Sequence, residues 1–319
     1  MSAESSGTSF VHIPVLHREV VEMMQMPADR SARLVDCTVG GGGHSSLLLE
    51  KYPKLELLGI DRDYDALNAA AERLSFARSR VMLMHGSFSE FPRLLRECGW
   101  DKVDGMLFDL GVSSPQLDRA ERGFAWRMEG PLDMRMNQDA ELTAGRLLNR
   151  ASAAELTRIF REYGEINGAG KLAAKIVEVR ETKPFGQVSD LVELCDSVLK
   201  RSRPGAPPVP TLVFQALRIA VNDELGELEN ALANVPEFLA PGGRVGVISF
   251  HSLEDRIVKN FFRFESTGCI CPPGLPVCRC GHLPRLQTLT RKPLVPQADE
   301  IAENRRSACS KLRVAERLA

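Results

Sequence analysis

Short apolar runs alternate with amphipathic stretches over the first third of the chain. The runs have the length of buried strands, and the stretches between them carry apolar residues at helical spacing. We expect strands at 34–39, 55–60, 81–84 and 103–110, and helices at 45–52 and 65–74. Alternation of this kind predicts βαβ units and a mainly parallel sheet, which is an α/β fold.

The pattern changes after Pro115, where apolar residues recur at helical spacing without convincing strands. Helices are expected at 143–163, 171–180 and 188–200, and the proline-rich segment 203–210 should form an irregular linker. The sheet pattern then resumes. It predicts a long helix at 212–239, a strand at 244–250, a helix at 253–264 opened by a capping box of Ser252 and Asp255, and edge strands at 288–295 and 310–318.

These elements predict two domains. One is a discontinuous α/β domain formed by residues 10–114 and 211–319, and the other is an all-α domain inserted at 115–210. Composition agrees with a folded protein, since 44% of residues are hydrophobic and 26% are charged. No apolar run is long enough to span a bilayer, and the first nine residues do not resemble a secretory signal. We therefore expect a cytoplasmic protein.

The net charge of −1 excludes a globally basic nucleic-acid binder, but the charge is unevenly distributed. Residues 256–319 contain 12 Lys and Arg against 5 Asp and Glu. A basic region of this kind can contact phosphates, or it can simply be a solubilising surface. The charge pattern alone leaves both interpretations open.

A glycine run, Gly40 to Gly43, follows the first predicted strand, and Asp61 ends the second. A glycine-rich turn into a helix lets the backbone approach a ligand, and a carboxylate on the next strand can accept hydrogen bonds from ribose hydroxyls. The alternative is a purely structural turn, with Asp61 capping the helix that follows.

Two classes of cofactor fit such a loop. A dinucleotide site calls for a third glycine, where this chain has Ser45. The pattern Asp36-x-Thr38-x-Gly40-x-Gly42 instead fits S-adenosylmethionine-dependent methyltransferases, with Thr38 where glycine is commonest. We favour methyl transfer over hydride transfer.

The fourth predicted strand ends in Asp109 and leads to Ser113, Ser114 and Pro115. Ligands of open α/β sheets bind at the carboxyl ends of the strands. An exocyclic base amine is a poor nucleophile, and oxygen acceptors at this edge can localise its lone pair and hold it in line with a methyl group. Asp109, Ser113 and Ser114 are therefore candidate catalytic residues that orient an amine. The alternative is a turn that leaves the strand.

Arginines alternate with aromatic residues over 119–127. This mixture suits a flipped base beside phosphates, although it is more often an amphipathic surface loop. The spacing within 130–136 suggests no chemistry.

Taken together, the motifs resemble the bacterial methyltransferases that act on cytosine N4 of 16S ribosomal RNA. The matching segments span nearly the whole chain: 12–15, 41–45, 61–63, 109–118, 122–124, 130–136, 214–219 and 249–256. The chain departs from the family pattern at Leu212 and Val213, at Arg305 and at Ala308, which affects presumed surface contacts.

The resemblance implies a Rossmann-like class I methyltransferase that forms N4-methylcytidine near the decoding centre, with S-adenosyl-L-methionine as cofactor. The partner would be 16S rRNA or the small ribosomal subunit, with no membrane and no obligate protein partner. The implied cofactor contacts are Gly42, Gly43, His44, Asp61, Phe88, Asp109 and Gln116. Asp109 thus has two candidate roles, one toward the cofactor and one toward the amine.

Two other classes remain open. One is an amino methyltransferase that acts on another RNA or on DNA, and the other is a non-enzymatic RNA-binding assembly factor that keeps the fold.

Four cysteines gather late in the chain, at Cys269, Cys271, Cys278 and Cys280, with His282 close behind. Four thiols can bind one tetrahedral zinc ion, although two intervening residues are a commoner spacing than one. A disulfide pair is less expected in a reducing cytoplasm. The sequence leaves zinc and free thiols as alternatives.

Overall fold

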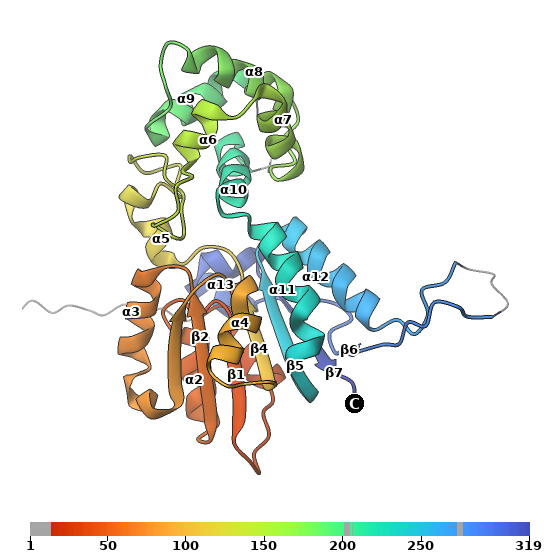
Figure 1. Cartoon of the computed structure of the whole chain (residues 1–319). Helices are drawn as coiled ribbons and strands as arrows, with labels where there is room; N and C mark the ends of the chain where they lie inside the picture. Colours follow the sequence, from red (N-terminus) through yellow and green to blue (C-terminus); the bar gives the residue numbers. More distant parts are fainter. Residues whose placement is uncertain (1–13, 201–204, 206, 273–276) are drawn as a thin grey trace, which may run out of the picture.

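The computed structural model describes residues 14–200, 205, 207–272 and 277–319. His12 and Ile13 of one family motif, and residues 203, 204 and 206 of the predicted linker, lie outside them. Within this part of the chain a seven-stranded sheet has the order β3-β2-β1-β4-β5-β7-β6 (Figure 1). The first five strands of that order run parallel, and β7 is antiparallel to both β5 and β6.

The strands, apart from β6, lie close to their predicted positions. They are β1 (Ala32–Asp36), β2 (Leu55–Asp61), β3 (Val81–His85), β4 (Val103–Asp109), β5 (Leu239–Ser249), β6 (Leu286–Thr288) and β7 (Lys311–Arg317). The interior strands β2 and β4 are almost wholly buried, which explains why they read as continuous apolar runs rather than alternating ones.

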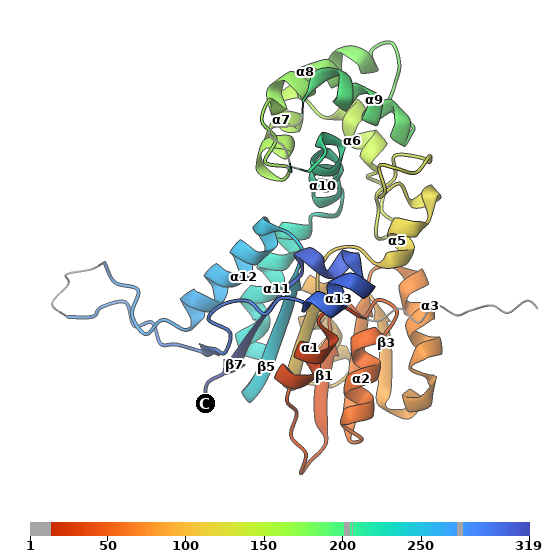
Figure 2. The same ribbon diagram turned by 180° about the vertical axis from the view of Figure 1, so that it is seen from behind.

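Helices cover both faces of the sheet. One face packs against α1 (His17–Met23), α2 (Gly43–Lys51) and α3 (Tyr64–Arg73), and the other against α4 (Phe91–Glu97), α11 (Glu224–Phe238) and α12 (Ser252–Glu265) (Figures 1 and 2). The short helices η1 (Ser75–Arg80) and η2 (Phe88–Glu90) flank β3. Two hydrophobic clusters, one on each face, make up the core of the sheet domain.

A third hydrophobic cluster holds together the helices that rise above the sheet in Figure 1. Its elements are α6 (Ala144–Arg150), α7 (Ala153–Glu162), α8 (Ala169–Arg180), α9 (Val188–Val198) and α10 (Val209–Asn222). Phe160, Leu172 and Leu217 are fully or almost fully buried in it. The cluster therefore includes α10, although α10 comes after the proline-rich segment.

Two predicted helices are each divided in two. Residues 143–163 form α6 and α7, because Ser152 caps α7 by accepting a hydrogen bond from the backbone N–H of Glu155 at 3.1 Å. The predicted helix at 212–239 is α10 and α11. They meet at Asp223, whose φ of 47° is left-handed and ends the first helix.

Three further predictions are wrong in detail. The helix α12 is capped one residue earlier than expected, by His251 and Glu254, and Asp255 instead pairs with Arg313 at 2.7 Å. Of the edge strand predicted at 288–295, only Thr288 belongs to β6, which begins at Leu286, and Leu294 adds a single bridge to β7. The helix α10 begins inside the predicted linker, with Pro210 in its first turn, where the missing N–H breaks no hydrogen bond.

The remaining elements cross the carboxyl edge of the sheet. They are α5 (Ser114–Asp118), η3 (Ala120–Arg122), α13 (Ala298–Glu303) and η4 (Arg305–Cys309). Among the described residues, no helix has the length and apolar character to cross a membrane. The architecture is a Rossmann-like α/β sheet that carries a helical unit, in agreement with the predicted fold class.

Asp223, the left-handed residue between α10 and α11, allows a test of why the two helices are separate. Asp and Asn tolerate positive φ, whereas a β-branched side chain does not. We expect Asp223→Val to lower the free energy of unfolding by about 1–2 kcal/mol, and Asp223→Asn to leave it nearly unchanged. Urea denaturation measures both values. Equal stability of the two variants would show that the break does not depend on this backbone conformation.

Candidate functional site

Three neighbouring parallel strands end in an aspartate at the same edge of the sheet. Asp36 ends β1, Asp61 ends β2 and Asp109 ends β4. The register pairs Asp36 with Gly59 of β2 and with Leu107 of β4, so all three strands finish within two residues of one level. Parallel pairing thus places three carboxylates where an open α/β sheet binds its ligands.

The glycine run turns from β1 into α2 at this edge. Gly42 has a left-handed φ of 75°, and a Cβ there would lie 3.1 Å from the side chain of Leu74, so the position strongly favours glycine. Gly43 is the first residue of α2. The first backbone N–H groups of a helix have no acceptor within the helix and point out of its N-terminus. The loop therefore presents a helix N-terminus of the kind that holds nucleotide ligands.

Asp61 is bound to this loop. Its Oδ2 accepts a hydrogen bond from the backbone N–H of Gly40, and its Oδ1 accepts one from that of Asp63, both at 2.9 Å. Each carboxylate oxygen has two acceptor positions, so one remains on each for a further donor. Burial raises the pKa of Asp61. The geometry fits a carboxylate that accepts two vicinal hydroxyls.

Asp109 lies between His44 and Thr38. Its backbone N–H donates to Thr38 Oγ1 at 2.6 Å, and its Oδ2 lies 3.5 Å from His44 Nδ1. Oδ1 has no hydrogen-bond partner among the described residues, although it is buried. An unpaired buried acceptor costs free energy, so its presence points to a missing donor from a ligand.

The protonation of the His44–Asp109 pair follows from its surroundings. His44 Nε2 lies 2.7 Å from the carbonyl oxygen of Val15 and must donate to it, which leaves Nδ1 as an acceptor. Burial lowers the pKa of His44 and, with a contribution from Glu254, raises the pKa of Asp109 to about 7. Asp109 thus changes charge near neutral pH, unlike an exposed carboxyl.

Asp36 has a different environment. It is buried and accepts hydrogen bonds from Ser45 Oγ at 2.6 Å and from the backbone N–H of Thr38 at 3.3 Å. Burial raises its pKa to about 6. Both of its oxygens have partners within the loop, so Asp36 holds the turn that carries the glycines.

Gln116 connects α5 to the end of β2. Its Oε1 accepts from the backbone N–H of Ser113 at 3.1 Å, and its Nε2 donates to Asp63 Oδ2 at 2.9 Å. Ser113 and Ser114 thereby stand at the N-terminus of α5, a few residues beyond Asp109. Both polar ends of Gln116 are occupied by the protein itself.

Phe88 follows β3 on η2 and is partly buried. Its ring meets Phe108 of β4 edge-on, with centroids 6.1 Å apart, and the guanidinium of Arg62 lies 5.5 Å from its centroid. The aromatic ring thus lies beside the residue that follows Asp61. The structure brings all the predicted cofactor residues to the carboxyl edge.

The arginine and aromatic segment at 119–127 is not simply a surface loop. Arg122 is buried, and its Nη2 donates to Asp63 Oδ2 at 2.8 Å and to the carbonyl oxygens of Arg135 and Met136. Gly123 has a φ of 69°, and a Cβ there would lie 2.2 Å from the carbonyl oxygen of Pro131. Residues 130–136, whose spacing suggested no chemistry, form the other side of this contact.

Sequence reasoning missed a buried ion-pair network between the two units. Arg218 of α10 donates from Nε to Glu224 of α11 at 2.8 Å, and the negative charges of Glu224 and of Glu254 on α12 raise the pKa of Arg218. Arg218 Nη2 has no partner among the described residues. The only sequence signal was the occurrence of charged residues inside otherwise apolar helical patterns.

The four clustered cysteines do not belong to this site. They follow α12 on a segment that extends away from the sheet (Figure 1).

The comparisons with known proteins concern the whole chain. Residues 9–318 match the profile that describes the MraW methylase family. The chain belongs to this family.

Curated relatives agree with the assignment to the MraW methylase family. Ribosomal RNA small subunit methyltransferase H of Heliobacterium modesticaldum is 48% identical over 314 residues, covering 97% of this chain and 99% of that protein. The protein of the same name from Solidesulfovibrio magneticus is 49% identical over 312 residues, with 97% and 96% covered. Among solved structures, an rRNA methylase from Streptococcus thermophilus covers 95% of this chain and 94% of its own, with 11% identity and a TM-score of 0.41. So loose a likeness supports no conclusion about function.

As a member of the MraW methylase family, the chain is an S-adenosylmethionine-dependent methyltransferase. The edge of the sheet fits this cofactor. It offers a helix N-terminus and, in Asp61, a carboxylate with two free acceptor positions. Membership of the MraW methylase family sets aside the competing prediction of a dinucleotide-dependent oxidoreductase.

The pKa of Asp109 predicts a pH-dependent difference in stability. Asp109 has a pKa of about 7 in the folded state and an ordinary value of 3.8, so the folded protein binds this proton more tightly than the unfolded chain does. Protonation of Asp109 therefore contributes to the stability of the fold. This contribution is fully present below about pH 4 and is lost as the pH rises through about 7. Without cofactor, we expect Asp109→Asn to be more stable than the unsubstituted protein, with a margin that grows from pH 4 to pH 7 and then stays constant.

Melting temperatures measured from pH 4 to pH 8 check this expectation. Asp101→Asn, the same change at an exposed position before β4, is the control. A pH-independent margin for Asp109→Asn would contradict the burial of an ionisable Asp109.

Proposed function

We propose that this methyltransferase transfers a methyl group to the N4 amine of a specific cytidine in 16S ribosomal RNA, near the decoding centre. The unpartnered Asp109 Oδ1 at the end of β4 carries the proposal, because it is an acceptor waiting for a donor such as an exocyclic amine. The relatives' name, which specifies ribosomal RNA of the small subunit, supports the substrate class. Such a substrate places the enzyme in the cytoplasm, with the small ribosomal subunit or its RNA as partner.

The cofactor is held by the loop and strand ends already described. Gly42, Gly43 and His44 would line its amino-acid end at the start of α2, and Asp61 would accept both ribose hydroxyls. Phe88 would flank the adenine ring. Gln116, whose amide group bonds Ser113 and Asp63, would act by holding α5 against the end of β2.

The bound cofactor supplies an electrophilic methyl group on a sulfonium. Asp109 accepts a hydrogen bond from the amine, which localises the nitrogen lone pair and holds it in line for attack. Ser113 and Ser114 help to orient the amine at the start of α5. After transfer the nitrogen must lose a proton, and a carboxylate with a pKa of about 7 is matched to accept it at neutral pH.

The mechanism needs no covalent enzyme intermediate. Cys37 follows Asp36 at this edge, but it is buried, and burial raises its pKa well above the ordinary value. A protonated thiol is a weak nucleophile. Direct transfer to nitrogen also differs from chemistry at a ring carbon, which calls for such an adduct.

We propose that the helical unit, beginning at residue 115, guides the RNA to the strand ends. Its division from the sheet domain falls best after α10, at Asn222, because α10 packs into the helical cluster rather than onto the sheet. Two contacts hold the C-terminal region, residues 256–319, near the start of this helical unit and near the start of α1. Arg306 of η4 pairs with Asp118 of α5, and Glu300 of α13 accepts from the backbone N–H of Leu16 at 2.7 Å.

Methyl transfer with the purified enzyme tests the substrate directly. The enzyme is incubated with methyl-labelled cofactor and with 16S rRNA, small subunits, large-subunit rRNA or DNA, and the products are digested to nucleosides. We expect label only in N4-methylcytidine, and only from 16S rRNA or small subunits. Label in another nucleoside, or transfer to DNA alone, contradicts the proposed substrate.

Two aspartate variants separate cofactor binding from chemistry. Asp61→Asn loses charge-assisted bonds to the ribose, so cofactor affinity should fall about a hundredfold, or about 3 kcal/mol. Asp109→Asn should bind the cofactor with less than about a tenfold change but transfer methyl about a hundredfold more slowly. Calorimetric titration and single-turnover rates measure the two effects, with Asp101→Asn as the matched control. A large loss of cofactor affinity in Asp109→Asn would assign Asp109 to the cofactor alone.

A further inference from the structure

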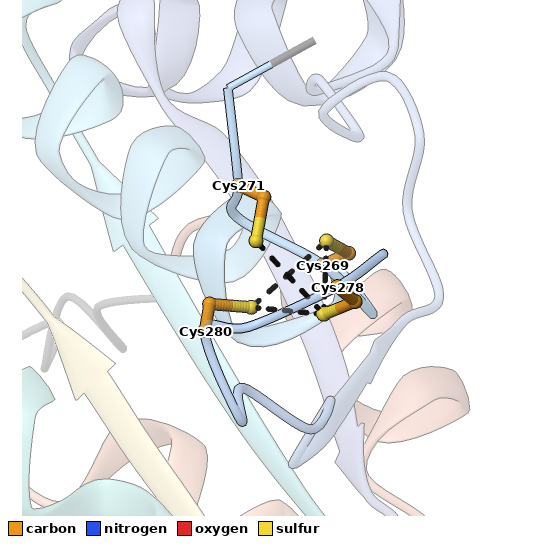
Figure 3. Close-up of side chains that lie close together, drawn as sticks. All are labelled: Cys269, Cys271, Cys278 and Cys280. Carbon is orange, nitrogen blue, oxygen red and sulfur yellow. Dashed lines mark hydrogen bonds between the residues drawn. The ribbon is translucent and has the colours of Figure 1, made fainter. Parts of the chain in front are cut away.

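Four thiols converge on one point in the segment between α12 and β6. Cys278 Sγ lies 3.4 Å from Cys269 Sγ, 3.9 Å from Cys271 Sγ and 3.5 Å from Cys280 Sγ, and Cys269 and Cys280 are 3.9 Å apart. All four sulfurs lie within 4.8 Å of one another. In Figure 3 the side chains come from two stretches of irregular chain and point toward a common centre.

These separations match a metal site rather than disulfides. A disulfide holds its sulfurs about 2.0 Å apart, far closer than any pair here. A zinc ion with Zn–S bonds of about 2.3 Å at the centre of a tetrahedron sets the sulfurs about 3.8 Å apart. The four separations between 3.4 and 3.9 Å bracket that edge.

The surroundings of the thiols fit the same interpretation. The backbone N–H of Arg279 donates to Cys271 Sγ at 3.4 Å, as backbone amides do around metal-bound thiolates. His282 is not a fifth ligand. Its Nε2 lies 3.1 Å from the carbonyl oxygen of Phe264, and its ring lies 4.7 Å from the Phe264 ring, which anchors the segment to α12.

The segment has little else to hold its shape. Its described residues between Thr267 and Arg285 form no helix or strand, and Ile270, Val277 and Leu283 are all exposed. A chain segment without a buried apolar core needs a cross-link or a metal to adopt one conformation. Here four cysteines, two before and two after a proline-rich loop, occupy the position of such a link.

We propose that Cys269, Cys271, Cys278 and Cys280 bind one structural zinc ion as a four-thiolate site. On binding, the thiols that are still protonated release their protons to solvent, and no oxidant or reductant is involved. Four protein ligands complete the tetrahedron and leave no open position, so the site does not take part in methyl transfer. It fixes the described parts of the projecting segment, residues 267–272 and 277–285, relative to α12 and the sheet edge.

Elemental analysis of the full chain, purified with a non-thiol reductant and without chelator, tests the proposal. The unsubstituted protein should contain close to one zinc ion per chain, and Cys278→Ser should contain only background zinc. Cys309→Ser, which removes an exposed cysteine outside the cluster, should keep its zinc. Titration of the thiols with an organomercurial should release the zinc in step with the reaction of four cysteines.

Limited trypsin digestion gives a readout of the structural role. Arg279 lies between two of the ligands and is exposed, so cleavage there should be slow in the zinc-loaded protein and fast in Cys278→Ser or after chelation. Affinity for S-adenosylmethionine should remain unchanged in Cys278→Ser, which shows that the variant is folded. Reduced protein without zinc overturns the proposal, as does stoichiometric iron, zinc retained by Cys278→Ser, or cleavage that is independent of metal.

Discussion

The parallel register of β1, β2 and β4 is the constraint on which the rest of the site depends. It brings Asp36, Asp61 and Asp109 to one edge, where burial disfavours their charged forms. Hydroxyl and backbone N–H donors partly compensate the cost of burying the charges of Asp36 and Asp61. Among the described residues, no donor reaches Oδ1 of Asp109. This oxygen can therefore accept a hydrogen bond from a ligand.

The same edge positions the elements that approach the substrate. Asp63, two residues after Asp61, caps α3 and accepts from both Gln116 and Arg122, so the cofactor strand, α5 and the loop beyond it form one network. Asn222 at the end of α10 then donates to the carbonyl oxygen of Met134 and accepts from the backbone N–H of Met136. Polar contacts therefore run without interruption from the cofactor loop to the base of the helical unit.

The sheet and the positions of its aspartates follow from the sequence because they depend on local patterns. An apolar run that ends in a charged residue specifies both a strand and the level at which it stops. The breaks at Ser152 and Asp223 were not predicted, because apolar periodicity continues across them while a cap or a single backbone angle ends the helix. The burial of Arg122 was not predicted for a similar reason. Its burial depends on Asp63 and on carbonyl groups of residues 135 and 136, which only the folded chain brings together.

The central claim is that the Asp109 edge of this methyltransferase modifies a cytosine amine in 16S rRNA. The most direct measurement is mass spectrometry of 16S rRNA from cells that lack the gene and from the same cells carrying either the unsubstituted protein or Asp109→Asn. The account predicts that N4-methylcytidine at one position disappears on deletion and returns only with the unsubstituted protein. An unchanged level of N4-methylcytidine in the deletion strain, or full restoration by Asp109→Asn, would contradict it.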